Sequence, residues 1–158
     1  MILVDTSVWI DYLRDADNDE VAWFKDVLDH GYPFGITSVI YQEVLQGADS
    51  EKSFDRLDDF LSTQAIYEPL DAVESHREAA RLYFRSRRAG FTIRSTIDCL
   101  IAQVAIEHDL LLLARDRDFQ TLSNVEPRLR LYTGPYRTGS TESWVHEPES
   151  PYDPEPRS

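Results

Sequence analysis

Short apolar runs alternate along this chain with longer amphipathic segments, and this alternation is the feature that most restricts its fold. The apolar runs predict strands over 2–4, 34–37, 65–67, 110–114 and 129–132. Helical spacing of apolar residues predicts helices over 7–14, 20–30, 38–46, 51–62, 71–89 and 95–108. Strands separated by helices favour a parallel sheet covered on both faces. We therefore expect an α/β fold with a central parallel sheet of four to five strands.

Length and composition indicate one folded domain followed by a tail. The chain has 158 residues, of which 42% are hydrophobic, and this suits a single core. Residues 134–158 hold five of the eight prolines and few large apolar side chains. Such a segment buries too little surface to offset the entropy of ordering it. We expect a domain over 1–133 and an acidic, proline-rich, mostly disordered tail over 134–158.

The sequence also restricts the compartment and the kind of site. No apolar run approaches the ~18 residues that a membrane helix needs, and the N-terminus does not read as a signal peptide. The single cysteine, Cys99, excludes an internal disulfide framework and a multi-cysteine zinc site. We expect a cytoplasmic protein that does not associate with a membrane.

Two acidic residues stand where apolar strands end. Asp5 directly follows the predicted strand 2–4, and Asp116 comes two residues after the predicted strand 110–114. Ligands of open α/β sheets bind outside the carboxyl ends of the strands, at the switch point between neighbours. If the two strands are adjacent, these carboxylates converge. The alternative is that each aspartate caps the helix that follows it, because Asp is a preferred N-cap residue.

Two further acidic residues share helix faces with small or apolar side chains. Glu43 lies three residues after Ile40, so it falls on the apolar face of its helix unless it turns outward. A carboxylate on such a face is costly unless it is paired or binds a metal. Asp98 lies four residues before Ala102, on a face that can approach the sheet closely. The alternative for Asp98 is a capping box with Ser95.

Several carboxylates packed together would repel one another and titrate upward without a counter-charge. No lysine lies nearby in the sequence to supply it, since Lys52 is the last lysine. Ligands that are all carboxylate oxygens suit a hard divalent cation such as Mg²⁺ or Mn²⁺. Such an ion lowers the pKa of a bound water, orients it for attack on a phosphodiester and stabilises the leaving oxygen. This chemistry needs no catalytic histidine, and the four histidines show no metal-ligand spacing.

Four segments occur in a characteristic order: MILVDTSVWIDYLR, YQEVLQG, TIRSTIDCLIAQVA and LLLARDRDF. They resemble the motifs of the PIN-domain ribonucleases, in particular the VapC-type toxins of toxin–antitoxin pairs. The resemblance covers residues 1 to about 133. One departure is Ala114, where relatives often carry Thr or His. The resemblance places the acids of the family at Asp5, Glu43, Asp98, Asp116 and Asp118, and its adjoining hydroxyls at Thr6 and Ser7.

This resemblance implies a three-layer α/β/α domain and a Mg²⁺-dependent endoribonuclease that cuts single-stranded RNA, with Mn²⁺ as a substitute. It also implies a type II toxin that forms a homodimer and is blocked by a small VapB-type antitoxin. On this reading the catalytic residues are Asp5, Glu43, Asp98 and Asp116, and the metal ligands are Asp5, Asp98 and Asp116. Glu43 would be a further ligand or a base, and Thr6, Ser7 and Asp118 would support the site.

The basic residues are concentrated in one window. The chain carries 29 acidic against 16 basic residues, for a net charge of −13, so it is a poor general binder of nucleic acid. Residues 77–94 nevertheless contain six arginines and a single acid. Arg77, Arg81 and Arg85 recur every four residues and would form one stripe that binds RNA phosphates or an acidic antitoxin segment, with Arg94 nearby. The alternative is a solvated face with local pairs such as Glu74–Arg77.

Two other functions compete with the nuclease hypothesis. A phospho-acceptor receiver domain also places acids at strand ends, but it usually needs a lysine after the last strand and does not explain Glu43. A catalytically idle PIN fold that only binds RNA or a protein is the stronger alternative. All the acids of the family pattern are present, and this favours the nuclease.

Overall fold

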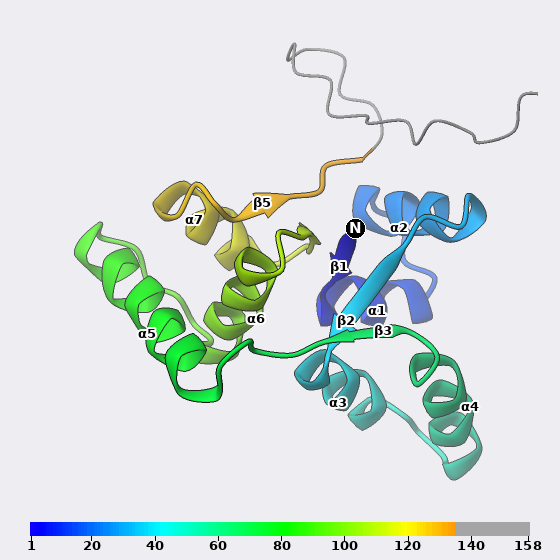
Figure 1. Ribbon diagram of the computed structural model, residues 1–158. Helices are drawn as coiled ribbons and strands as arrows, with labels where there is room; N and C mark the ends of the chain where they lie inside the picture. The colour runs from blue at the N-terminus through cyan, green and yellow to red at the C-terminus, as the bar shows by residue number, and fades with distance from the viewer. Residues whose placement is uncertain (135–158) are drawn as a thin grey trace, which may run out of the picture.

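Five parallel strands form one sheet in the order β3-β2-β1-β4-β5, seen in the computed structural model of Figure 1. The strands are β1 (Ile2–Val4), β2 (Phe34–Thr37), β3 (Ala65–Tyr67), β4 (Leu111–Leu113) and β5 (Arg130–Leu131). The structure describes residues 1–134. The predicted parallel sheet of four to five strands is confirmed, with five strands. The expected disordered tail falls, apart from residue 134, outside the described residues.

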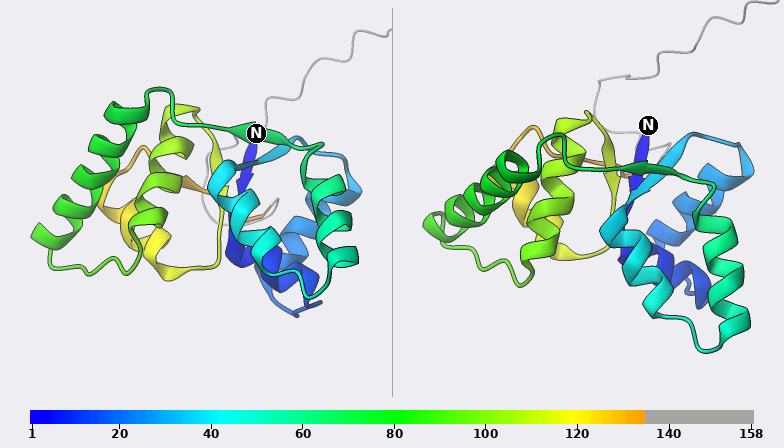
Figure 2. Two further views of the ribbon diagram at one scale, coloured as in Figure 1. Left: turned by 90° about the horizontal axis from the view of Figure 1, so that it is seen from below. Right: turned by 60° about the horizontal axis from the view of Figure 1, so that its bottom comes forward.

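Helices cover both faces of this sheet, as Figures 1 and 2 show. On one face lie α1 (Thr6–Leu13), α2 (Asp19–Asp29), α3 (Ser38–Gln46) and α4 (Glu51–Leu61), and on the other lie α5 (Ala72–Arg88), α6 (Thr96–Glu107) and α7 (Arg117–Val125). This is the expected three-layer α/β/α arrangement. Within residues 1–134, no helix is both long and apolar enough to cross a membrane.

Helix α7 is the one element that the sequence analysis did not predict. Its apolar residues Phe119 and Leu122 are three positions apart and fully buried, so the helical period was present. The helix is short and begins within the charged run from Arg115 to Asp118, so few apolar residues mark its helical spacing. This helix matters for function because Asp116 is its N-cap residue.

The core is centred on β1, whose three side chains are all buried. On one face of the sheet, Trp9 of α1 packs edge-on against Phe24 of α2, with ring centroids 4.7 Å apart. On the other face, buried side chains such as Leu82 and Ile101 come from α5 and α6. Each such side chain contributes about 1.5–3 kcal/mol by leaving water. The two packed faces hold β1 rigidly at the centre of the sheet.

The carboxyl ends of β1 and β4 are direct neighbours. Val4 pairs with Leu113, and the backbone N–H of Asp5 donates to the carbonyl oxygen of Leu113 at 2.9 Å. The chain leaves β1 for β2 on its other side, so the order of the strands reverses at β1. This is the switch point at which open α/β sheets bind ligands. β1 and β4 are therefore adjacent, as the convergence of Asp5 and Asp116 requires.

Candidate metal centre

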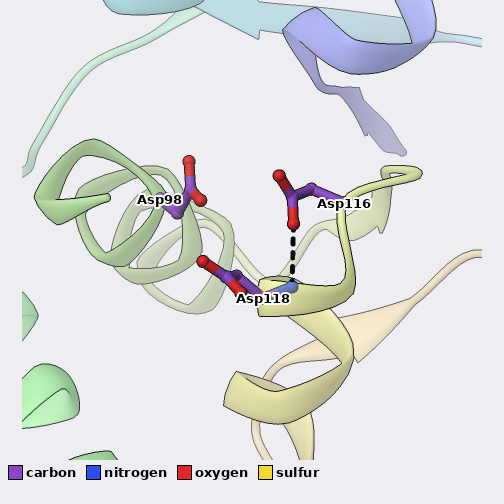
Figure 3. A group of neighbouring side chains, drawn as sticks. All are labelled: Asp98, Asp116 and Asp118. Carbon is purple, nitrogen blue, oxygen red and sulfur yellow. Dashed lines mark hydrogen bonds between the residues drawn. The ribbon is translucent and has the colours of Figure 1, made fainter. Parts of the chain in front are cut away.

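Three aspartates meet beyond the carboxyl ends of the strands (Figure 3). Asp98 projects from the first turn of α6, Asp116 precedes α7, and Asp118 lies in the first turn of α7. One carboxylate oxygen from each lies within 4.8 Å of the others. Asp118 is buried, whereas Asp98 and Asp116 are half-buried. The three side chains face one another across a space that a single cation would bridge.

Asp5 and Glu43 extend this acidic group toward β1 and α3. Asp5 is only 4% exposed, and its Oδ2 accepts hydrogen bonds from the backbone nitrogen of Ser7 at 2.9 Å and from Ser7 Oγ at 2.6 Å. Burial and the charge of Asp5 raise the pKa of Asp98, although Asp5 is not one of the three residues whose oxygens lie within 4.8 Å of one another. Glu43 accepts a hydrogen bond from Thr6 Oγ1. All five predicted acids therefore lie in one region, in which Asp98, Asp116 and Asp118 form a cluster with one oxygen each within 4.8 Å of the others.

Asp5 and Asp116 are helix caps, as the alternative in the sequence analysis predicted, and they belong to the acidic site as well. Asp5 caps α1, and Asp116 caps α7 by accepting from the backbone nitrogen of Asp118 at 3.0 Å. Ser95 caps α6 by accepting from the backbone nitrogens of Ile97 and Asp98. Within residues 1–134 the Asp98 carboxylate makes no return bond to the Ser95 amide, so the capping box is half formed. Capping fixes the carboxylates, and three helix N-termini bring partial positive charge to the cluster.

The pKa values of Asp98 and Asp5 are shifted upward by burial and by repulsion between the carboxylates. Burial, together with the charges of Asp5, Asp116 and Asp118, raises the pKa of Asp98 to about 7. Burial also raises the pKa of Asp5, with the charge of Glu43 adding to the effect while the hydrogen bonds from Ser7 oppose it. Convergent carboxylates with raised pKa values and oxygen-only ligands fit a hard divalent cation, which would favour their ionised forms.

Arg94 contacts two of the clustered aspartates. Its Nη2 lies 2.6 Å from Oδ1 of Asp116, and its Nε lies 3.3 Å from Oδ2 of Asp118. Its backbone nitrogen also donates to Oδ2 of Asp118 at 2.8 Å. The sequence analysis placed Arg94 with the RNA- or antitoxin-binding residues. The structure places its side chain across the acid cluster, a contact between residues more than twenty positions apart that no local pattern reveals.

The predicted arginine stripe lies exposed on α5, and its members are paired. Arg77 contacts Glu74, Arg81 lies 3.4 Å from Glu78, and Arg85 lies 3.0 Å from Glu126. The local ion pairs that the sequence analysis gave as the alternative are therefore present. The three arginine side chains remain 43–62% exposed. Together with Ala80 and Phe84 they line an open hollow on the surface.

Comparisons with known proteins agree with this geometry. The family model of the PIN domain matches residues 2–125. The VapC ribonuclease Mb1587 of Mycobacterium bovis is 32% identical over 126 residues, which make up 79% of this chain and 93% of that protein.

Solved structures share the same fold at lower identity. The VapBC2 structure from Rickettsia felis, bound to a DNA fragment from its promoter, aligns with a TM-score of 0.63 at 23% identity, over 84% of this chain and 98% of that one. A toxin–antitoxin complex from Klebsiella pneumoniae aligns with a TM-score of 0.57 at 24% identity, over 75% and 90% of the two chains.

Proposed function

This chain belongs to the PIN domain family, with a VapC ribonuclease among its relatives, and on that premise we propose that it is a Mg²⁺-dependent endoribonuclease that cleaves single-stranded RNA. We also propose that it is the toxin of a type II toxin–antitoxin pair, that a VapB-type antitoxin blocks its site and that it forms a homodimer. The relative's name as a ribonuclease and the toxin–antitoxin complex of the same fold support this proposal.

The observation that carries the proposal is the convergence of carboxylate oxygens at the ends of β1 and β4. Asp5, Asp98 and Asp116 would hold the cation, with Asp118 beside them. When bound, Mg²⁺ or Mn²⁺ supplies the Lewis acidity that activates water and stabilises the leaving oxygen of a phosphodiester. The substrate strand would lie beyond the carboxyl ends of β1 and β4, where these acids gather.

The chain's own side chains orient the reacting groups. Ser7 holds Oδ2 of Asp5 by two hydrogen bonds and so fixes the orientation in which this carboxylate would meet the cation. Thr6 fixes the carboxylate of Glu43 beside Asp5, where Glu43 can serve as a further ligand or accept the proton of the attacking water. The backbone nitrogen of Asp118 donates to Oδ1 of Asp116 and so holds this carboxylate at the start of α7.

The basic surface would bind the RNA backbone. Arg77, Arg81 and Arg85 present exposed guanidinium groups along α5 even though each has an acidic partner. The loop over 89–95 leads from the end of α5 to the start of α6 and Asp98 (Figure 2). A strand bound along α5 would therefore be guided toward the acids, and an acidic antitoxin segment would use the same groups.

The deciding experiment is cleavage of single-stranded RNA by the purified chain, free of inhibitor. We expect cleavage with Mg²⁺ or Mn²⁺, none with EDTA, and a loss of at least ~100-fold in Asp5→Asn and Asp98→Asn. Asp59→Asn is the matched control, because Asp59 is an exposed acid on α4, far from the cluster in the fold.

Two results would overturn the proposal. Cleavage that persists in both Asp5→Asn and Asp98→Asn would point to a contaminant or to another site. RNA binding without cleavage, with each cation tested, would favour the alternative of a catalytically idle PIN fold that only binds RNA or a protein.

A further inference from the structure

We propose that Arg94 is an internal counter-charge that competes with the divalent cation for Asp116 and Asp118, and that cation binding frees its guanidinium for the RNA phosphate. The inference rests on the proposed function, because it assumes that the acid cluster takes a cation. It makes Arg94 a positioning residue that couples cation binding to RNA binding.

Arg94 holds carboxylate oxygens of Asp116 and Asp118, two of the three acids that converge. Oδ1 of Asp116 accepts from Arg94 Nη2 at 2.6 Å and from the backbone nitrogen of Asp118 at 3.0 Å. Oδ2 of Asp118 accepts from both the Nε and the backbone nitrogen of Arg94. Asp98, the third acid of the cluster, has no ion pair within residues 1–134. Arg94 therefore neutralises one side of the cluster and leaves the other side charged.

The guanidinium and a cation would compete for two reasons. Both would bind the carboxylates of Asp116 and Asp118, and one oxygen from each of the three acids lies within 4.8 Å of the others. A cation held there would be within a few ångströms of the guanidinium charge, so the two like charges would repel. Bridging by Arg94 and full cation binding thus oppose each other.

Release of the side chain brings the guanidinium into water, since the Arg94 side chain is already 69% exposed, and its pair with the 36% exposed Asp116 contributes little free energy. The Asp118 side chain is only 9% exposed, so its carboxylate would need the charge of the cation in place of the guanidinium. The backbone bond from Arg94 to Asp118 is separate from the side-chain contacts, so the loop can stay in place while the guanidinium swings away.

The released guanidinium would lie at the mouth of the site. One guanidinium cannot bridge two aspartates and grip a phosphate at the same time. Cation binding would then raise the affinity for RNA, and by thermodynamic reciprocity RNA would raise the affinity for the cation. Loss of the Arg94 side chain would remove this coupling.

Titration of the full chain with Mn²⁺ by calorimetry at about pH 7.5 tests the competition. We expect Arg94→Gln to bind Mn²⁺ about tenfold more tightly than the wild type. Arg94→Lys, which keeps the charge but replaces the planar guanidinium fork by a single nitrogen, should fall between them. Arg117→Gln is the matched control: it removes an exposed arginine located between Asp116 and Asp118 in the sequence, for which no ion pair is found within residues 1–134.

A second measurement tests the release of the side chain. The affinity of a short fluorescent 2′-O-methyl RNA is measured by anisotropy with and without Mn²⁺, and a denaturing gel confirms that the oligonucleotide stays intact. We expect Mn²⁺ to tighten binding of this RNA to the wild type about fivefold more than to Arg94→Gln.

The outcomes separate the two proposals. Equal Mn²⁺ affinity of Arg94→Gln and wild type, with binding lost in Asp98→Asn, would overturn the competition while the metal site stands. Weaker Mn²⁺ binding in Arg94→Gln would make Arg94 a support of the site and would also overturn it. No Mn²⁺ binding in any variant would instead contradict the proposed function. If Arg94→Gln does not fold, as judged by circular dichroism, Arg94→Lys carries the same test.

Discussion

The hydroxyl of Ser7 accepts a hydrogen bond at 3.1 Å from the backbone nitrogen of Arg115, a residue 108 positions later in the chain. The same hydroxyl donates to Oδ2 of Asp5 at 2.6 Å. Ser7 therefore links the turn that carries Asp116 to the buried aspartate at the end of β1. One small side chain sets the position of an acid from each of the two central strands.

We expect Ser7→Ala to lower the cleavage rate about tenfold, because groups that orient metal ligands typically contribute factors of that size. Ser7→Thr keeps the hydroxyl and should retain most of the activity. Single-turnover cleavage of RNA in saturating Mg²⁺ measures the effect, and a thermal melt confirms that each variant is folded. Wild-type rates in Ser7→Ala would show that the link is dispensable.

Removal of the Asp98 carboxylate should stabilise the cation-free chain at high pH. Its pKa of about 7, against an ordinary value of 3.8, means that the folded state holds this proton more tightly than the unfolded state. The resulting stability is fully present below about pH 4 and is lost as the pH rises through about 7. Asp98→Asn does not ionise, so it should unfold with a free energy higher by about 2 kcal/mol near pH 8, a value reduced for the partial exposure of the carboxylate to solvent.

Urea unfolding in EDTA near pH 4 and near pH 8 measures this difference, which should nearly vanish at the lower pH. Asp59→Asn serves as the control and should follow the wild type at both values. An Asp98→Asn variant that is less stable than the wild type at high pH would mean that the carboxylate is already compensated in the absence of a cation.

Glu126 should stabilise the fold through its two arginines. It is 5% exposed, and it lies 2.9 Å from Arg128 and 3.0 Å from Arg85 of α5. Hydrogen bonds from Arg128 lower the pKa of Glu126 to about 2. This stability is present above the ordinary pKa of 4.5 and is lost as the pH falls toward 2.

We expect Glu126→Gln to lower the free energy of unfolding near neutral pH by about 2 kcal/mol, a value reduced for the solvent exposure of both guanidinium groups. The difference should shrink near pH 3. Glu68→Gln, at an exposed carboxylate, is the control. A deficit that stays constant from neutral pH to acid would mean that packing, and not charge, accounts for the loss.

Charge reversal on α5 should weaken RNA binding without unfolding the domain. Arg81 is exposed and carries one acidic partner, Glu78. Arg81→Glu should reduce RNA affinity about tenfold at low salt and should reduce the salt dependence of binding. Arg56→Glu makes the same charge change on α4 and serves as the control. Equal affinities for the two variants would leave the stripe as ordinary solvated surface.

Much of the fold could be predicted from the sequence because its signals are local. The strands at 34–37 and 65–67 and the helix over 38–46 coincide with the observed elements, since they follow from apolar spacing and capping within a few residues. The acids were found in the same way, as carboxylates at strand ends or on apolar helix faces. Helix α7 was missed because its apolar pattern spans only two turns.

The amino-acid sequence alone determined which elements form and which acids stand at their ends, because periodicity and capping act over a few residues. Only the tertiary structure decided that β1 and β4 are neighbours, that Asp118 joins Asp98 and Asp116 in one cluster, and that Arg94 crosses the cluster. Electrostatic interactions depend on distances between side chains, and the packing of both helical layers onto the sheet sets those distances.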